Sequence, residues 1–167
     1  MPTLVGHGLV LRAVRRDDLD AVTAISFYDG RPARDRADAA AMLDRIEADV
    51  AAGSSLHWGI CVDGADLVVG TVGFYRGFER CSGEVGYVLN EAFRGSGIMT
   101  RAVRMVVAYG FGQLGLERVE ATTDRENRAS QAVLSRAGFR LVGDDGAGLR
   151  FAIDPADGGA DVVDGPG

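Results

Sequence analysis

A short glycine-rich segment in the second half of the chain has the residue types of an anion-binding turn. It follows a predicted strand, opens a predicted helix and reads Arg94-Gly95-Ser96-Gly97-Ile98-Met99. The first N–H groups of a helix lack intrahelical partners and the helix dipole adds positive potential, so this arrangement offers a phosphate site. Gly95 and Gly97 allow the backbone to approach a phosphate closely.

The glycines alone leave two interpretations of this turn open. The segment is not a P-loop, because it lacks the Gly-Lys-Ser/Thr ending. It is not a strong dinucleotide fingerprint either, because the third glycine is missing and the segment lies late in the chain. It is therefore either a phosphate site or an ordinary tight connection between a strand and a helix.

A second polar group opens a later predicted helix, with Asn127 three residues before Ser130 and Gly138-Phe139 after the end of the helix. Asparagine is a favoured N-cap residue. The plain structural interpretation is a helix cap and a surface serine. Capping and contact with a cofactor are compatible for Asn127.

The elements that position these residues follow from hydrophobic periodicity and turn signals. We predict strands at 9–14, 57–62, 67–78, 84–89, 118–123, 139–142 and 149–153, and helices at 17–27, 34–52, 98–114 and 127–137. This order, β-α-α-β-β-β-α-β-α-β-β, indicates an α/β layered domain (α+β by some schemes) with a mixed sheet. The segment 84–123 is predicted to be a right-handed parallel crossover.

Length and composition are those of one globular domain. The 167 residues are 47% hydrophobic and 25% charged, and we predict a domain over 1–153 followed by a disordered Gly/Asp-rich tail at 154–167. No apolar run approaches the roughly 20 residues of a membrane helix, no signal peptide is evident, and Cys61 and Cys81 lack zinc or redox spacing. These features favour a cytoplasmic protein. The net charge of −6 argues against a nucleic-acid partner.

The ordered set of motifs resembles the GNAT superfamily of acetyl-CoA-dependent N-acetyltransferases, and most closely its RimJ/RimL-like branch. The resemblance covers about residues 8–153 and rests on the opening Leu9-Val10-Leu11-Arg12, the strand Glu84-Val85-Gly86-Tyr87-Val88-Leu89, the glycine turn and the Asn127 helix. It implies a mixed, mostly antiparallel central sheet with a parallel splayed strand pair and helices on both faces.

The resemblance also implies where acetyl-CoA, the acyl donor, binds; it implies no metal. The cofactor would lie in the splay between 84–90 and 117–123, with its pyrophosphate on the glycine turn and a backbone N–H polarising the thioester carbonyl. Met99 stands where relatives carry a small residue, so its side chain should point into the core. The implied cofactor-binding residues are Val88, Leu89, Arg94, Gly95, Ser96, Gly97, Ile98, Met99, Asn127 and Ser130.

Catalysis needs a proton acceptor for the ammonium and a donor for the leaving thiolate. Many relatives carry a tyrosine acid where this chain has Leu134, which has no proton to donate. By resemblance to the RimJ/RimL branch, Ser130 is the candidate donor. Glu84, at the start of the strand beside the splay, is the first choice of base. Asp124, Glu126 and a base acting through water are the alternatives.

The predicted function is acetyl transfer to a primary amine, either a peptide or protein N-terminus or a small amine. A catalytically silent acyl-CoA-binding or sensor domain is the alternative from another class. The sequence identifies neither the acceptor nor the oligomeric state, although a homodimer is common in such folds.

Overall fold

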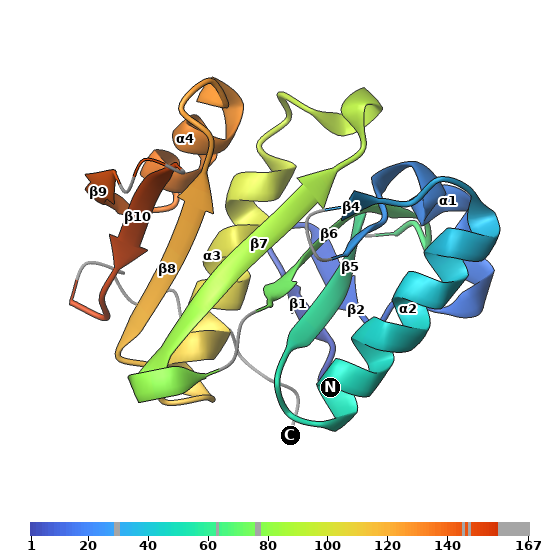
Figure 1. The fold of residues 1–167 in the computed structure, drawn as a ribbon, viewed down its shortest axis with the longest axis horizontal. Helices are drawn as coiled ribbons and strands as arrows, with labels where there is room; N and C mark the ends of the chain where they lie inside the picture. The colour runs from blue at the N-terminus through green and yellow to red at the C-terminus, as the bar shows by residue number, and fades with distance from the viewer. Residues whose placement is uncertain (29–30, 63, 76–77, 145, 147, 157–167) are drawn as a thin grey trace.

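The computed structural model describes residues 1–28, 31–62, 64–75, 78–144, 146 and 148–156. An eight-stranded sheet forms its centre, in the order β1-β2-β5-β6-β7-β8-β10-β9. Every neighbouring pair in this sheet is antiparallel except β7 and β8. The predicted mixed, mostly antiparallel sheet with one parallel pair is therefore confirmed (Figure 1).

The first part of the chain supplies one edge of the sheet and the helices of one face. Its elements are β1 (Leu4–Gly6), β2 (Leu9–Arg12), the 3-10 helix η1 (Arg16–Asp18), α1 (Leu19–Val22), the 3-10 helix η2 (Thr23–Ile25), β3 (Phe27–Tyr28), β4 (Arg31–Pro32) and α2 (Arg36–Ala51). The two-residue strands β3 and β4 form a separate small ladder. Asp35 caps α2 by accepting the N–H of Asp38 at 2.8 Å.

The rest of the chain supplies the centre and the other edge of the sheet. Its elements are β5 (Leu56–Val62), β6 (Val68–Phe74), the 3-10 helix η3 (Glu79–Cys81), β7 (Ser82–Leu89), the 3-10 helix η4 (Glu91–Phe93), α3 (Ile98–Gly112), β8 (Arg118–Thr123), α4 (Arg128–Arg136), β9 (Arg140–Asp144) and β10 (Leu149–Ile153). The predicted strands at 57–62, 84–89, 118–123 and 149–153 match β5, β7, β8 and β10 to within two residues.

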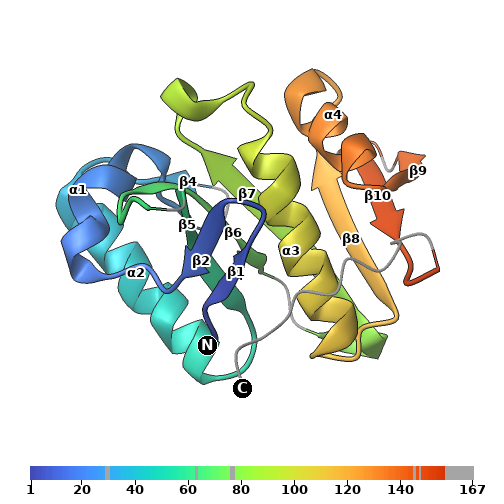
Figure 2. The same cartoon turned by 180° about the vertical axis from the view of Figure 1, so that it is seen from behind.

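The helices form two layers on opposite faces of the sheet. In Figure 1, α2 lies in front of the sheet and α3 behind it, and the half turn of Figure 2 reverses this order. Two hydrophobic clusters correspond to these layers. Residues of α3 and α4, such as Val103, Val106 and Leu134, pack on one face, while Leu19, Val22 and Leu43 of α1 and α2 pack on the other. The front of β8 and β10 has no helix over it (Figure 1).

The predicted first helix at 17–27 is wrong as one continuous element, because the chain there forms two 3-10 turns around a four-residue helix. Hydroxyl groups compete for its carbonyls: Thr23 donates to Leu19 at 2.6 Å and Ser26 donates to Val22 at 2.9 Å. Such bonds favour turns over regular helix. The structure also adds β1, which the sequence analysis did not predict.

The predicted tail at 154–167 is only partly described. Asp154, placed at the start of the predicted tail, accepts hydrogen bonds from Arg118 at 3.0 Å and Arg140 at 2.8 Å. The remainder of the predicted tail from 157 onward lies outside the described residues. In the part of the chain that the structure describes, no helix is long and apolar enough to cross a membrane.

Candidate active site

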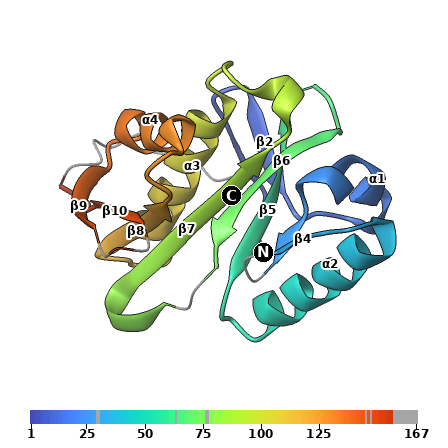
Figure 3. The ribbon, with the colours of Figure 1, turned by 45° about the horizontal axis from the view of Figure 1, so that its top comes forward.

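A cleft opens where the parallel strands β7 and β8 part. Among the described residues their register comprises three pairs, which begin at Ser82 and Arg118 and end at Glu84 and Glu120. Beyond the last pair the two strands diverge (Figure 3). A cavity of about 220 Å³ lies between them. Its lining residues come from β7, β8 and the start of α4: Val85, Gly86, Tyr87, Ala121, Thr122, Thr123, Asp124, Asn127 and Ser130.

The pairing of β7 with its other neighbour, β6, determines which residues of β7 direct their N–H and C=O groups toward the cleft. Near one end of this antiparallel ladder the Tyr75 N–H donates to the Glu84 carbonyl at 3.1 Å, and at the other end the Asn90 N–H donates to the Val69 carbonyl at 2.9 Å. The register between these bonds is unbroken. In an antiparallel pair, alternate residues direct both backbone groups at the partner strand. The even-numbered residues of β7 therefore face β6.

It follows that the odd-numbered residues Val85, Tyr87 and Leu89 direct their N–H and C=O groups toward the cleft. Of the two predicted pantetheine contacts, Leu89 presents its backbone to the cleft, whereas Val88 pairs with Thr71 of β6. Beyond Glu84, no strand formed by the described residues lies beside the β8-facing edge of β7. An extended ligand placed along this edge meets the backbone groups of a free strand edge.

The glycine turn lies past the end of β7, between η4 and α3, on the side of the sheet where β7 and β8 diverge (Figure 1). Its residues are not among those that line the cavity. Among the described residues, the backbone N–H groups of 95–100 donate to no protein acceptor, and the first that does is that of Arg101, to the Gly97 carbonyl at 3.2 Å. Gly97 is the N-cap of α3, with no side-chain cap. These free N–H groups, together with the positive end of the helix dipole, make an anion site.

Both glycines of the turn are required by their backbone conformation. Gly95 and Gly97 have φ of 78° and 75°, in the left-handed region, and a Cβ added at either position meets nothing within 4 Å. The Ser96 hydroxyl donates to the Phe93 carbonyl at 2.7 Å, which ties the turn to η4. Arg94 is exposed beside the turn.

The residues that follow the turn anchor it to the core. Ile98 and Met99 are each 5% exposed and belong to the cluster beneath α3. The predicted inward direction of the Met99 side chain is therefore confirmed. Neither side chain obstructs the free amides at the start of the helix, so both residues are available to the site only through their backbone.

Asn127 and Ser130 lie in the other wall of the cleft. Asn127 is the N-cap of α4, and its Oδ1 accepts the Ser130 N–H at 3.0 Å, as the predicted cap requires. The Ser130 hydroxyl lies 2.8 Å from the hydroxyl of Tyr87 on β7. Burial raises the pKa of Tyr87 to about 12, although the hydrogen bond with Ser130 acts in the opposite direction. Tyr87 is therefore a neutral phenol at physiological pH.

Sequence analysis did not single out Tyr87 as a functional residue. A tyrosine in a strand is ordinarily read as a packing residue, and its partner Ser130 is 43 positions away. The available signal was its position in the strand. Tyr87 lies two residues after Val85 and so shares its strand face, and it is the member of that face with a polar tip beside the predicted splay.

Glu84 lies at the closed end of the cleft, as the last β7 residue paired with β8. Val85 is buried in the cluster beneath α3, so the alternation of strand side chains places Glu84 on the opposite face of the sheet from α3. Ser130 lies on α4, which packs on the α3 side. The two predicted catalytic residues therefore approach the cleft from opposite faces. Of the alternative bases, Asp124 lines the cleft and Glu126 is exposed outside the lining.

Tyr75 lies on the same face as Glu84. A Cβ added at Gly86 would come within 2.8 Å of the Tyr75 ring, so the ring lies directly against the backbone of β7. The Tyr75 hydroxyl is 2.8 Å from Nδ1 of His57. Burial lowers the pKa of His57 to about 4, so this histidine is neutral at physiological pH. It is a packed residue that holds Tyr75 in place.

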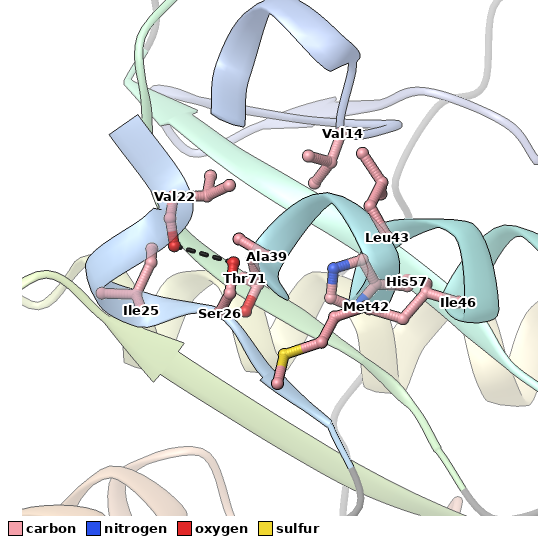
Figure 4. Close-up of a pocket in the computed structure, with 10 residues that line it drawn as sticks. All are labelled: Val14, Val22, Ile25, Ser26, Ala39, Met42, Leu43, Ile46, His57 and Thr71. Carbon is pink, nitrogen blue, oxygen red and sulfur yellow. Dashed lines mark hydrogen bonds between the residues drawn. The ribbon is translucent and has the colours of Figure 1, made fainter. Parts of the chain in front are cut away.

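A second cavity lies between α2 and the sheet (Figure 4). Most of its lining is apolar, from residues such as Met42 and Leu43, and three polar side chains border it: Ser26, His57 and Thr71. It is large enough for about one water molecule. This cavity is too small for a substrate and belongs to the core of the α1 and α2 layer.

Leu134 occupies the helix position at which many GNAT enzymes carry a tyrosine. It is fully buried in the cluster beneath α3, and it contributes packing rather than a proton. Cys61 is buried and Cys81 is exposed. Among the described residues, no group of three or more His, Cys, Asp or Glu side chains is placed to hold a metal ion.

A mostly antiparallel sheet whose single parallel pair parts around a cleft, with free helix N-terminal amides past the end of β7, defines a GNAT-type acyltransferase fold. Residues 8–140 match the family described as the acetyltransferase (GNAT) domain. The chain belongs to this family of N-acetyltransferases.

Individual relatives agree with this assignment. The chain is similar to the "Uncharacterized N-acetyltransferase p20" of Bacillus licheniformis, with 30% identity over 86% of this chain and 85% of the relative. It is 38% identical to the "Probable N-acetyltransferase YjcK" of Bacillus subtilis over 60% of this chain, a match that spans about half (54%) of that relative. Among solved structures, Mycobacterium smegmatis RimJ in complex with CoA-disulfide is 28% identical, with a TM-score of 0.76 over 93% of this chain and 87% of RimJ.

Proposed function

We propose that the protein transfers the acetyl group of acetyl-CoA to a primary amine by direct attack of the amine on the thioester. The observation that carries this proposal is the free edge of β7, which leads from a set of unpartnered helix amides to a closed cleft end bearing a carboxylate. The CoA found in the RimJ complex supports the choice of cofactor. The acceptor is a peptide or protein N-terminus or a small amine.

The cofactor would enter at the glycine turn, with its pyrophosphate on the N–H groups of 95–100. Its pantetheine arm would follow the cleft-facing backbone of Leu89, Tyr87 and Val85 toward the closed end. From Leu89 to Glu84 this edge runs for roughly 17 Å, at about 3.4 Å per residue. The Asn127 amide nitrogen remains available for a pantetheine carbonyl, because only its oxygen is used in the helix cap.

The acceptor would approach from the face opposite α3, where Glu84 and Tyr75 lie. Glu84 would take a proton from the ammonium, and the free amine would attack the thioester carbonyl. A cleft-facing N–H of β7 would bind the oxygen on which negative charge develops. When the carbon–sulfur bond breaks, the electron pair goes to sulfur and Ser130 would donate a hydrogen bond to it. The overall reaction yields an amide, the CoA thiol and one proton.

Acetyl-CoA should raise the melting temperature of the protein by roughly 5–10 °C at about 100 times its dissociation constant, through mass action. In the same preparation, a panel of peptides and small amines should show release of CoA thiol with at least one member. Binding without turnover on the panel would favour the acyl-CoA sensor. Stabilisation by ATP or NAD but not by CoA would exclude the proposed cofactor.

Glu84→Gln should lower kcat about 100-fold, the usual contribution of a positioned general base. The affinity for acetyl-CoA should change little, since Glu84 is placed on the acceptor side. Glu117→Gln is the matched control, because this exposed glutamate has no assigned role and directly precedes β8, the other strand of the closed end. Unchanged turnover in Glu84→Gln, with a loss in Asp124→Asn, would transfer the role of base to Asp124.

A further inference from the structure

One side-chain hydrogen bond joins the two walls of the cleft. The Tyr87 hydroxyl on β7 and the Ser130 hydroxyl on α4 are 2.8 Å apart, and the same Tyr87 oxygen is 3.4 Å from the Ser130 carbonyl. Both residues line the cleft. The phenol therefore reaches both oxygens of Ser130 from the wall along which the pantetheine arm is placed.

Ser130 is held at two points. Its N–H is fixed by Asn127 Oδ1 at 3.0 Å, which sets the position of its backbone in the first turn of α4. Within the described part of the chain, the Tyr87 phenol is the one protein group that forms a hydrogen bond with the Ser130 hydroxyl. The backbone bond places the residue, and the phenol selects the direction of the hydroxyl.

We propose that Tyr87 is a positioning residue that orients the Ser130 hydroxyl toward the sulfur of CoA; this rests on the role proposed for Ser130. The phenol donates to the Ser130 oxygen, so that the serine proton is free to point into the cleft. A serine with one accepted hydrogen bond is also the better donor, because hydrogen bonds in a chain polarise one another. No proton transfer from Tyr87 is required.

The electrostatics of Tyr87 agree with the role of a donor. Burial keeps the pKa of Tyr87 at about 12, so the phenol retains its proton throughout the pH range of the reaction. A phenolate would instead accept the serine proton and turn the hydroxyl away from the sulfur. It would also place a second negative charge beside the developing thiolate.

A purely structural role for Tyr87 makes different predictions. If the bond only latched β7 to α4, its loss would widen the cleft and weaken acetyl-CoA binding. If Tyr87 acts through Ser130, its loss should reduce kcat and spare the KM for acetyl-CoA. It should also have no further effect once the serine hydroxyl is absent, because coupled residues are not additive.

The test is a double-mutant cycle with Tyr87→Phe, Ser130→Ala and the double variant, measured on the best amine of the panel. We expect kcat to fall about 30-fold in Ser130→Ala and about 10-fold in Tyr87→Phe. The double variant should match Ser130→Ala within about twofold. Tyr109→Phe on α3, whose ring packs on Trp58 in the core, is the matched control and should retain full activity.

A second readout does not require turnover. A hydrogen bond to a charged group stabilises that charge, so CoA bound to the wild type should have a thiol pKa roughly one unit or more lower than CoA bound to either single variant. The ultraviolet absorbance of the thiolate, titrated in the three complexes, measures this shift.

Each outcome distinguishes the two proposals. Wild-type protein that binds CoA but turns over no amine refutes the proposed function, and the thiol titration then still decides the role of Tyr87. Multiplicative losses in the cycle, an increased KM with unchanged kcat in Tyr87→Phe, or equal thiol pKa values in the wild type and Tyr87→Phe would each overturn the positioning role. Failure to bind CoA would remove both proposals.

Discussion

Gly97→Asp is expected to lower the affinity for CoA about 1,000-fold, whereas Gly97→Asn should change it by no more than about twofold. Gly97 precedes the free amides of α3 and has φ of 75°. Asparagine and aspartate are nearly isosteric, and both tolerate left-handed backbone better than other non-glycine residues. The two variants therefore differ chiefly in one negative charge at the proposed pyrophosphate site.

The size of this difference follows from Coulomb's law. A carboxylate about 4 Å from one phosphate charge is repelled by about 4 kcal/mol at an effective dielectric constant of 20, which corresponds to roughly 1,000-fold in affinity. Salt screens exposed charges, so the ratio between the two variants should shrink as ionic strength rises. No competing local contact obscures the comparison, because a Cβ at this position meets nothing within 4 Å.

Calorimetric or fluorescence titration with CoA at low and high salt measures the affinity of each variant and the salt dependence of their ratio. Gly112→Asp near the end of α3 controls for a general effect of added charge, because a Cβ there also meets nothing within 4 Å. Its CoA affinity should remain near that of the wild type. Equal affinity of Gly97→Asp and Gly97→Asn would remove the pyrophosphate from this turn, even if the protein still bound CoA elsewhere.

Features encoded by local sequence were predictable. The glycine turn, the Asn127 cap and the inward Met99 all depend on residues within a few positions of one another, and local backbone preferences decide them. The parallel pair followed from the strand–helix–strand order of 84–123, whereas the mostly antiparallel sheet and its splay came from the resemblance to a family.

Features that depend on register or distant partners were not predictable. Whether Val88 or Leu89 faces the cleft depends on which residues of β7 bond to β6, and that choice is set by the pairing of the whole ladder. The contact between Tyr87 and Ser130 joins residues 43 positions apart across a splay whose width the sequence does not specify. The ion pair between Arg12 and Asp18 buries one acid that the sequence does not distinguish from its exposed neighbours Asp17 and Asp20.

Asp18 is the buried member of the ion pair that holds η1 and α1 against the sheet. Its side chain is 6% exposed and accepts two hydrogen bonds from the Arg12 guanidinium, at 2.7 and 2.8 Å. It also accepts the Arg15 N–H at 2.7 Å. Burial by itself raises the pKa of Asp18, but these hydrogen bonds outweigh it, and the pKa lies below its ordinary value.

Asp18→Asn should therefore lower the free energy of unfolding by about 3 kcal/mol, the lower end for breaking a buried pair, because Arg12 retains its contact with exposed Asp66. This corresponds to a decrease in melting temperature of roughly 6–12 °C. Asp20→Asn removes an exposed carboxylate two residues away, paired with Arg36, and should change the free energy by less than about 1 kcal/mol. Equal melting temperatures for the two variants would contradict the role assigned to the buried pair.

The pH dependence distinguishes a charge effect from a packing effect. A carboxyl group whose pKa is lower in the folded state than in the unfolded state stabilises the fold fully above its unfolded pKa, about 3.9. That contribution decreases as the pH falls through the folded value. The difference in unfolding free energy between wild type and Asp18→Asn should thus be constant from about pH 5 to 8 and shrink below about pH 4. Denaturant titrations across this range measure it, and a difference that stays the same at pH 3 would assign the loss to packing instead of charge.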